Sequence, residues 1–322
     1  MAGSIEKQWG SVGIGAILLA PLGGVYALAW WAYQSIYTLK LKEPFQPHRP
    51  VIVVGNLIAG GAGKTPVTIF LAKLLLEMGE KVVIGCSGYG FPHEHGAALA
   101  PGGELLASEW ADEPAMIRYL LPSVPLVVGR DRVLAAELVH AHLPDHILLM
   151  DDGFQHLRLR NHISIVLDEV LLNSFCIPAG PYREPKTTGR ARADVVLPCS
   201  QFQIEVLSST LEIVNGPPCE TKVCDLLCAI ARPERLVNSL VGRGIQLQTI
   251  QTLPDHATLL EGNLLSKFES DRPLIVTAKD WVKMKERTDL ADKTIFAANY
   301  EVHISPASEL TKWLRAKLDG IN

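Results

Sequence analysis

The sequence predicts an α/β protein with a mostly parallel sheet, helices on both faces, a second smaller α/β domain and an apolar N-terminal helix. Two observations indicate the sheets. Short β-branched runs alternate with helical periodicity, and a glycine-rich loop joins the first such strand to the first such helix. The third observation is the absence of charged residues from Gln8 to Leu39. A length of 322 residues suggests about two domains.

The composition excludes several classes of protein. The chain is 48% hydrophobic and 20% charged, which is typical of an ordered protein. Its 30 basic and 34 acidic residues give a net charge of −4, whereas nucleic-acid binders usually carry a basic surplus, so we expect no nucleic-acid partner. The six cysteines form no Cys-x-x-Cys pair, so we expect neither a disulfide scaffold nor a zinc site.

Residues 1–45 are predicted to anchor the chain to a membrane. The uncharged segment exceeds the ~20 apolar residues that span a bilayer. Aromatic side chains between residues 30 and 37 precede Lys40 and Lys42, an order typical of the cytoplasmic edge of a membrane. Pro21, with glycines nearby, predicts a kink or a re-entrant turn. A cleaved signal peptide and a buried core helix are the alternatives.

The loop between a predicted strand at 50–55 and a predicted helix at 66–77 is expected to bind phosphate. In such a loop, backbone N–H groups and a helix N-terminus face phosphate oxygens. Lys64 would neutralise phosphate charge and Thr65 would ligate Mg²⁺, so the domain is predicted to be P-loop NTPase-like. A plain glycine turn is the alternative, because Ile58 stands where the usual pattern begins with glycine. The loop residues are Ile58, Ala59, Gly60, Gly61, Ala62, Gly63, Lys64 and Thr65.

Acidic and basic residues follow other strands of this domain, which is predicted to span 46–200. Asp151 and Asp152 end an apolar strand downstream of the phosphate loop, a position that suits a Mg²⁺ site better than a solvated turn. Asp112 opens a helix, where an acid is commonly a cap. The loop 178–192 is either a surface loop or an arginine clamp on phosphate. The further strands are predicted at 81–86, 124–129, 146–150, 163–167 and 195–198.

The second half is predicted to be a linker at 201–221 followed by a smaller α/β domain at 222–322. Strand and helix patterns alternate through this domain, and it contains no second phosphate loop. His256 follows one of its strands, and a lone loop histidine is more often structural than catalytic. The strands are predicted at 222–230, 245–252, 273–277 and 294–299. The helices are predicted at 233–241, 258–269, 280–286 and 307–318.

Several motifs, taken in order, resemble those of the tetraacyldisaccharide 4′-kinase family, the lipid A 4′-kinases. The run Asp-Asp-Gly-Phe-Gln-His is far more specific than the phosphate loop alone. The motifs are Val54-Gly55-Asn56-Leu57 with Gly60 to Pro66, Ser87-Gly88-Tyr89-Gly90, Asp112-Glu113-Pro114, Val128-Gly129-Arg130-Asp131-Arg132, Asp151 to His156, Pro178-Ala179-Gly180-Pro181 with Arg183-Glu184-Pro185, Pro254-Asp255-His256, and Thr277-Ala278-Lys279-Asp280.

The resemblance implies an ATP-dependent kinase that uses Mg²⁺ and phosphorylates the 4′-hydroxyl of a lipid-linked glucosamine disaccharide 1-phosphate. Its partners would be this lipid A precursor and membrane lipid at the cytoplasmic face of the inner membrane, with no obligate protein partner. Asp112 is implied to be the catalytic base, tuned by His256, and Lys64 to stabilise the transferred phosphate. Metal ligands are implied at Thr65, Asp151 and Asp152. Contacts to substrate or phosphate are implied for Tyr89, Glu113, Arg132, Gln155, His156, Arg183 and Glu184.

The chain departs from the family pattern at three places. Ser87 stands where arginine is usual, Ala111 where glycine is usual, and Ala231-Arg232 where Gly-Asn is usual. Two other functions compete with the kinase. One is a membrane-associated partner-switching P-loop ATPase, disfavoured because its extra loop lysine is missing. The other is a membrane-anchored nucleotide-binding module without catalysis, disfavoured by the intact Lys64, Thr65 and Asp152.

Overall fold

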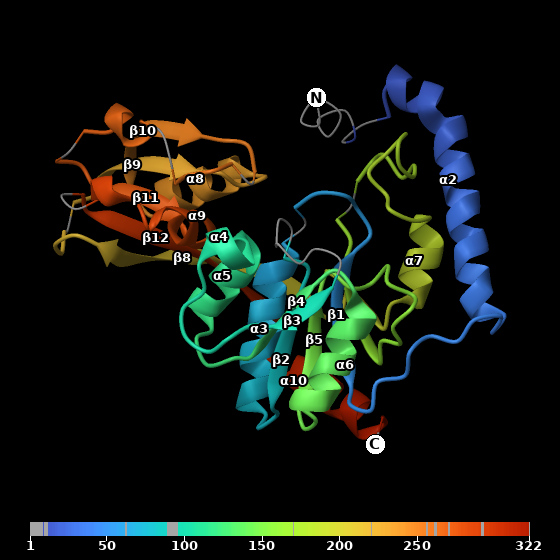
Figure 1. The fold of residues 1–322 in the computed structure, drawn as a ribbon. Coiled ribbons are helices and arrows are strands. Elements are labelled where there is room, and N and C mark those ends of the chain that lie inside the picture. Colours follow the sequence, from blue (N-terminus) through green and yellow to red (C-terminus); the bar gives the residue numbers. More distant parts are fainter. Residues whose placement is uncertain are drawn as a thin grey trace.

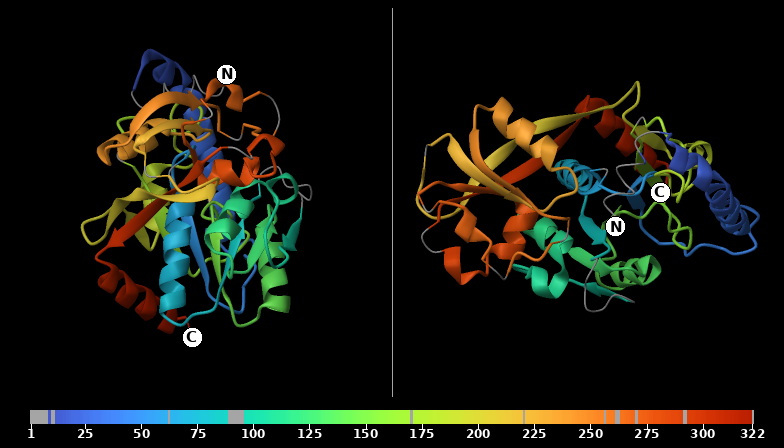
Figure 2. Two further views of the ribbon diagram at one scale, coloured as in Figure 1. Left: turned by 90° about the vertical axis from the view of Figure 1, so that its left-hand side faces the viewer. Right: turned by 90° about the horizontal axis from the view of Figure 1, so that it is seen from above.

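The chain folds into two lobes, with one long helix standing beside the larger lobe (Figures 1 and 2). The structure, a computed structural model, describes residues 9 and 12–321 except 62, 89–95, 170, 220, 256, 261–262, 270 and 291–292. The long helix is α2 (Ile14–Thr38). Each lobe contains one β-sheet.

The larger lobe is built on a seven-stranded sheet in the order β3-β4-β2-β5-β1-β6-β7. All neighbouring strands are parallel except β3 and β4. Its central strands are buried along their whole length, as expected when helices cover both faces. The strands are β1 (Val51–Asn56), β2 (Val82–Cys86), β3 (Ala97–Leu99), β4 (Leu126–Gly129), β5 (Ile147–Asp151), β6 (Ile163–Leu167) and β7 (Val195–Leu197).

Helices cover both faces of this sheet, which confirms the predicted fold class. On one face, α3 (Lys64–Glu77) and α5 (Asp112–Leu120) bury their apolar sides against the strands. On the other face, α6 (Arg132–His142) packs through small and branched side chains. Two shorter helices, α4 (Ala107–Trp110) and α7 (Lys186–Arg192), precede α5 and β7 respectively.

The smaller lobe contains a five-stranded sheet in the order β10-β9-β11-β12-β8, in which only β8 runs antiparallel to its neighbour. Its alternating strands and helices agree with the predicted pattern. Helices α8 and α9 pack into different apolar clusters. The elements are β8 (Gln203–Asn215), β9 (Val223–Cys228), α8 (Pro233–Gly242), β10 (Gln246–Thr252), β11 (Leu274–Thr277), α9 (Ala278–Met284), the 3₁₀ turns Leu265–Lys267 and Thr288–Leu290, and β12 (Ile295–Ser305).

Two elements of the second half differ from prediction. Most of the expected linker at 201–221 is β8, an edge strand of mixed polar and apolar residues that pairs with β12. Over 258–269, the described residues contain only the turn Leu265–Lys267 rather than a helix. Leu259 and Phe268 are nevertheless buried, so an irregular chain delivers them to the core.

The last helix, α10 (Ala307–Asp319), returns to the larger lobe. Leu310, Leu314 and Leu318 are at most 6% exposed and pack in the core beneath the first sheet. This helix therefore ties the C-terminal segment to the larger lobe, although the sequence pattern continues the alternation of the smaller one.

Helix α2 is continuous through Pro21, so the expected re-entrant turn is absent. Within this helix only Gly23 and Gln34 are buried, and apolar side chains such as Leu18 and Val25 are exposed. The helix is therefore not a buried core helix. By length and composition it is able to cross a membrane. Gly23 lets it approach the larger lobe, since a Cβ there would lie 2.9 Å from the Cys176 carbonyl oxygen.

Candidate active site

The phosphate loop lies where β1 ends and α3 begins, at the carboxyl edge of the sheet. Helix α3 starts at Lys64, two residues earlier than predicted, so Lys64 and Thr65 occupy its first turn. Gly60 (φ 101°) and Gly63 (φ 78°) adopt left-handed conformations that glycine tolerates without steric cost. The free N–H groups of this first turn are therefore available to an anion.

Not every predicted loop residue is available to a phosphate. Ile58 is only 2% exposed, and the Ala59 N–H donates to the Pro181 carbonyl over 2.7 Å. These two residues frame the loop instead. A Cβ on Gly61 would lie 3.0 Å from that of Ala231, so the loop borders the smaller lobe. Ala62 lies outside the described residues.

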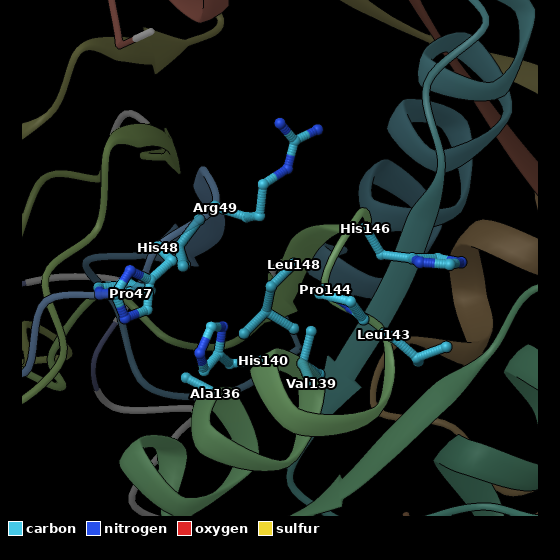
Figure 3. A pocket seen from close by; sticks show the side chains of 11 residues that line it. Pro47, His48, Arg49, Ala136, Val139, His140, Leu143, Pro144, His146 and Leu148 are labelled. Atoms are coloured by element: carbon cyan, nitrogen blue, oxygen red, sulfur yellow. The ribbon is translucent and has the colours of Figure 1, made fainter.

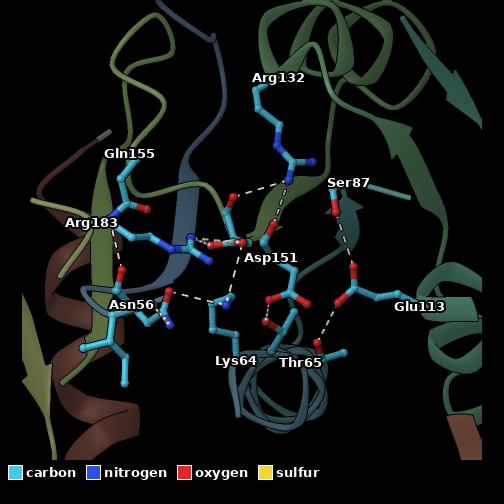
Figure 4. A network of polar contacts seen from close by, with 12 residues as sticks. Asn56, Lys64, Thr65, Ser87, Glu113, Arg132, Asp151, Gln155 and Arg183 are labelled. Atoms are coloured by element: carbon cyan, nitrogen blue, oxygen red, sulfur yellow. Dashed lines mark hydrogen bonds and ion pairs between the residues drawn. The ribbon is translucent and has the colours of Figure 1, made fainter. Parts of the chain in front are cut away.

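Lys64 and Arg183 hold the second aspartate of the acid pair (Figure 4). Lys64 Nζ lies 3.7 Å from Asp152 Oδ2 and 3.3 Å from Asn56 Oδ1. The Arg183 guanidinium donates to both Asp152 oxygens over 3.0 and 3.3 Å. Burial raises the pKa of Asp152, but Lys64 and Arg183 outweigh it and the pKa is lowered. Asp152 is thus an ionised group already paired with two cations.

Asp151 has different surroundings. It is 1% exposed, and its Oδ1 accepts a 3.0 Å hydrogen bond from Thr68. Its Oδ2 has no hydrogen-bond partner among the described residues. Burial, with the nearby Glu113 carboxylate, raises the pKa of Asp151 to about 7. A buried carboxyl with a vacant oxygen requires either a proton or a cation.

The donors around Asp151 suit Mg²⁺. Thr65 Oγ1 donates to Glu113 Oε1 over 2.9 Å, on the side of the site that faces Asp151 (Figure 4). Hydroxyl and carboxylate oxygens are the hard ligands that Mg²⁺ prefers, and the ion usually retains waters and phosphate oxygens as well. Accordingly, no group of three His, Cys, Asp or Glu side chains in the described part of the chain forms a closed metal cage.

Asp112, the first residue of α5, faces the smaller lobe through a lysine. Lys279 Nζ, at the start of α9, lies 3.9 Å from Asp112 Oδ2 and 2.7 Å from Asp255 Oδ1. His256 lies outside the described residues, but its neighbour Asp255 is brought to Asp112 in this way. Lys279 is not among the predicted site residues, although its position two residues after strand β11 was a usable signal.

Two of the expected phosphate or substrate contacts, Arg132 and Glu184, are buried and hydrogen-bonded to protein groups. Arg132 is 3% exposed, and its guanidinium donates to the carbonyls of Gly129, Asp151 and Asp152 over 3.0–3.3 Å. Glu184 is fully buried. In this structure each of the two charges is therefore bound to intramolecular partners, and their contact with substrate or phosphate stays a prediction.

Three other residues, Gln155, His156 and Tyr89, were expected to contact substrate or phosphate. Gln155 is half-buried and donates to the Asn56 carbonyl and to Glu184, each over 3.0 Å. His156 is exposed. Desolvation and the nearby Arg132 lower the pKa of His156 to about 4, which makes it neutral at pH 7. Tyr89 lies outside the described residues.

Two cavities differ in their relation to the sheet. A cleft of about 260 Å³, partly open to solvent, lies between the phosphate loop and the smaller lobe, and residues of both lobes line it. Another cavity lies at the opposite edge of the sheet, where β1 and β5 begin, and histidines and apolar residues line it (Figure 3). Ligands of open parallel sheets bind at the carboxyl edge, so the site is the inter-lobe cleft.

Comparison with known proteins identifies the family. Residues 15–319 match the family model described as tetraacyldisaccharide-1-P 4′-kinase. The chain belongs to the tetraacyldisaccharide-1-phosphate 4′-kinase family. A tetraacyldisaccharide 4′-kinase of Verminephrobacter eiseniae is 35% identical over 96% of this chain and 75% of the relative. One of Shewanella halifaxensis is 32% identical over 83% and 84%.

The fold is also that of a solved family structure. A crystal structure of LpxK from Aquifex aeolicus, described as an “apo” form in complex with ATP, superposes with a TM-score of 0.79 at 24% identity. The match covers 94% of this chain and 99% of that one. As a member of the 4′-kinase family, the chain is a phosphotransferase, and neither the partner-switching ATPase nor the non-catalytic module is favoured.

Of the departures from the family pattern, Ala231 and Arg232 line the cleft. Ala111 has φ 68° and ψ 166°, a conformation found almost only in glycine. Ser87 donates to Glu113 over 3.5 Å. Arg232 lies 2.6 Å from Glu169 Oε1 and so joins the smaller lobe of this kinase to the larger.

Proposed function

We propose that the chain transfers the γ-phosphoryl group of ATP, with Mg²⁺, to the 4′-hydroxyl of a lipid-linked glucosamine disaccharide 1-phosphate. The observation that carries this proposal is the meeting of Lys64 and Thr65, on the first turn of α3, with the Asp151–Asp152 pair. The site borders the inter-lobe cleft, which Thr65 lines. The names of the curated relatives support the acceptor.

Mg²⁺ would be held by Thr65 and Asp151, and when bound it would neutralise charge on the phosphates. Asp151 offers a buried oxygen without a hydrogen-bond partner among the described residues. Asp152 is paired with Lys64 and Arg183, so its main role would be to orient those two side chains, and Asp151 would be the main carboxylate ligand of Mg²⁺. Helix and loop N–H groups would bind phosphate oxygens.

Asp112 is the proposed general base for the acceptor hydroxyl, because it lies at the cleft and opens helix α5. Lys279 holds Asp112 next to Asp255, and His256 follows Asp255 directly in the chain. We therefore retain His256 as the residue that assists Asp112. A positioned base contributes typically about 10²- to 10⁴-fold to such a reaction.

Residues 1–45 would hold the enzyme at the cytoplasmic face of the inner membrane, where a lipid acceptor lies. The exposed apolar surface of α2 supports this placement. The domain division into 46–200 and 222–322 remains part of the proposal, with the qualification that α10 packs on the first sheet.

The test compares the rates of phosphoryl transfer by the wild-type chain and by two lysine variants of helix α3. Labelled ATP, Mg²⁺ and a lipid A disaccharide precursor should yield a bis-phosphorylated lipid with the wild-type chain. Lys64→Ala should lower kcat by about 10²-fold or more, because it removes a preorganised charge. Lys73→Ala is the control on the same helix, since Lys73 is half exposed and pairs only with the exposed Glu301 in the described contacts. Equal activity of the two variants, or ATP turnover independent of the acceptor, would contradict the proposal.

A further inference from the structure

Helix α2 carries a row of polar groups that faces the protein. Tyr26, Trp30 and Gln34 are spaced by four residues and so share one face of the helix. The Tyr26 hydroxyl donates to the Arg183 carbonyl over 2.7 Å. Trp30 Nε1 and Gln34 Nε2 donate to Glu184 Oε2 over 3.3 and 3.1 Å. A helix that served only as an apolar anchor would not require these three donors.

Their target, Glu184, is a fully buried carboxylate. Arg192 donates to both of its oxygens over 2.8 and 2.9 Å, and Gln155 donates to Oε1 over 3.0 Å. A buried ion pair is stable only when the remaining lone pairs are also satisfied. Trp30 and Gln34 of α2 donate to Oε2, so the packing of α2 and the Arg192–Glu184 ion pair support each other.

The same segment supports the phosphate loop from its other side. The Arg183 N–H donates to the Leu57 carbonyl over 2.8 Å, and the Ala59 N–H donates to the Pro181 carbonyl over 2.7 Å. The Arg183 side chain binds Asp152. Residues 181–184 therefore lie between α2 and the loop, and they are hydrogen-bonded to both.

A second connection passes through side chains to the catalytic lysine. Gln155 Nε2 contacts both Glu184 Oε1 and the Asn56 carbonyl. Asn56 in turn accepts a hydrogen bond from Lys64 Nζ over 3.3 Å, as Figure 4 shows for Gln155, Asn56 and Lys64. Displacement of Glu184 would thus alter the support of Lys64 as well as that of Arg183.

We propose that α2 is a positioning element of the kinase centre, in addition to any membrane role. The Tyr26–Trp30–Gln34 row fixes residues 181–184, and these fix the phosphate loop, Lys64 and Arg183. This inference rests on the proposed function for its kinetic readout, but not for its structural one. It makes turnover depend on the docking of the helix even when the acceptor is soluble.

The kinetic test compares two double variants on adjacent faces of α2. Trp30→Phe with Gln34→Met keeps an aromatic ring and an unbranched chain at these positions but removes both donors to Glu184. Trp31→Phe with Ser35→Ala is the matched control, because Trp31 is 58% exposed and Ser35 donates only to the Trp31 carbonyl in the described contacts.

With a short-chain soluble acceptor, the first double variant should lose about tenfold or more in kcat. Its KM for ATP should stay within about twofold, and it should sediment with phosphatidylethanolamine–phosphatidylglycerol vesicles like the wild type. The control should keep kcat within about twofold. Equal kcat in the two double variants would overturn the proposal and leave α2 as an anchor only.

Hydrogen exchange supplies a readout that does not require any acceptor. The amides of Ala59 and Arg183 should exchange at least threefold faster in the first double variant than in the control, because their supporting segment is loosened. This expectation holds even if the wild-type chain forms no bis-phosphorylated lipid, the result that would refute the proposed function. Unchanged exchange at both amides would refute the coupling itself.

Discussion

Asp151 should make the free energy of unfolding of the metal-free protein fall as the pH rises, and Asp151→Asn should abolish this dependence. Its pKa in the folded chain is about 7, against about 3.9 for an unperturbed aspartate. A group whose folded pKa is raised loses its contribution to stability as the pH rises toward that value. Between pH 5 and 7 the linkage relation gives a loss of about 2 kcal/mol in the free energy of unfolding.

Asp151→Asn removes this loss, because an amide has no proton to release while its Oδ1 can still accept from Thr68. Urea unfolding in EDTA at pH 5, 6 and 7 should show the wild type losing about 2 kcal/mol more than the variant over this interval. Adding Mg²⁺ at pH 7 should restore the wild type and have less effect on the variant, since the ion binds the deprotonated carboxylate.

The control is Asp145→Asn, at an exposed acid that pairs with Lys81 on the surface. Its stability should follow that of the wild type at each pH, because exposed ion pairs contribute little. If Asp151→Asn and the wild type lose stability in parallel, or if Mg²⁺ stabilises both equally, then Asp151 is neither the raised carboxyl nor the metal ligand.

Two further predictions concern the N-terminal end of α5, where Ala111 precedes Asp112. Ala111→Gly should raise the free energy of unfolding by about 1 kcal/mol in chemical denaturation, because relief of a glycine-only conformation exceeds the cost of glycine's flexibility. Ala316→Gly, at an exposed position of helix α10, should instead lower it by about 0.5–1 kcal/mol. A loss of stability in both variants would refute the strain at Ala111. Lys279→Met should lower kcat by about tenfold, because it removes the ammonium group that holds Asp112 next to Asp255. The affinity for ATP, measured by calorimetry, should change little. An unchanged kcat would show that this contact does not serve catalysis.

Local patterns were sufficient for much of the fold. A buried parallel strand is a short β-branched run, and the helix after it has an apolar face, so β1, α3 and β5 are readable from a few residues each. The same holds for the phosphate loop, where Gly63 must precede a helix that opens on Lys64. Strand β8 was not predicted, because an edge strand with many polar residues has no clear apolar pattern. Gly216 and the two prolines after it made the segment look like a linker.

The sequence by itself determined the chemistry at the carboxyl edge of the sheet: a lysine and a threonine at a helix start, and two acids at a strand end. It also determined the apolar character of α2. Only the tertiary structure decided what the charges do. Among the described residues, the buried Oδ2 of Asp151 has no hydrogen-bond partner, whereas Asp152 is paired with Arg183. Glu184 is fully buried against α2. The physical reason is that desolvation and pairing depend on which distant segments pack around a side chain, and no local periodicity records that.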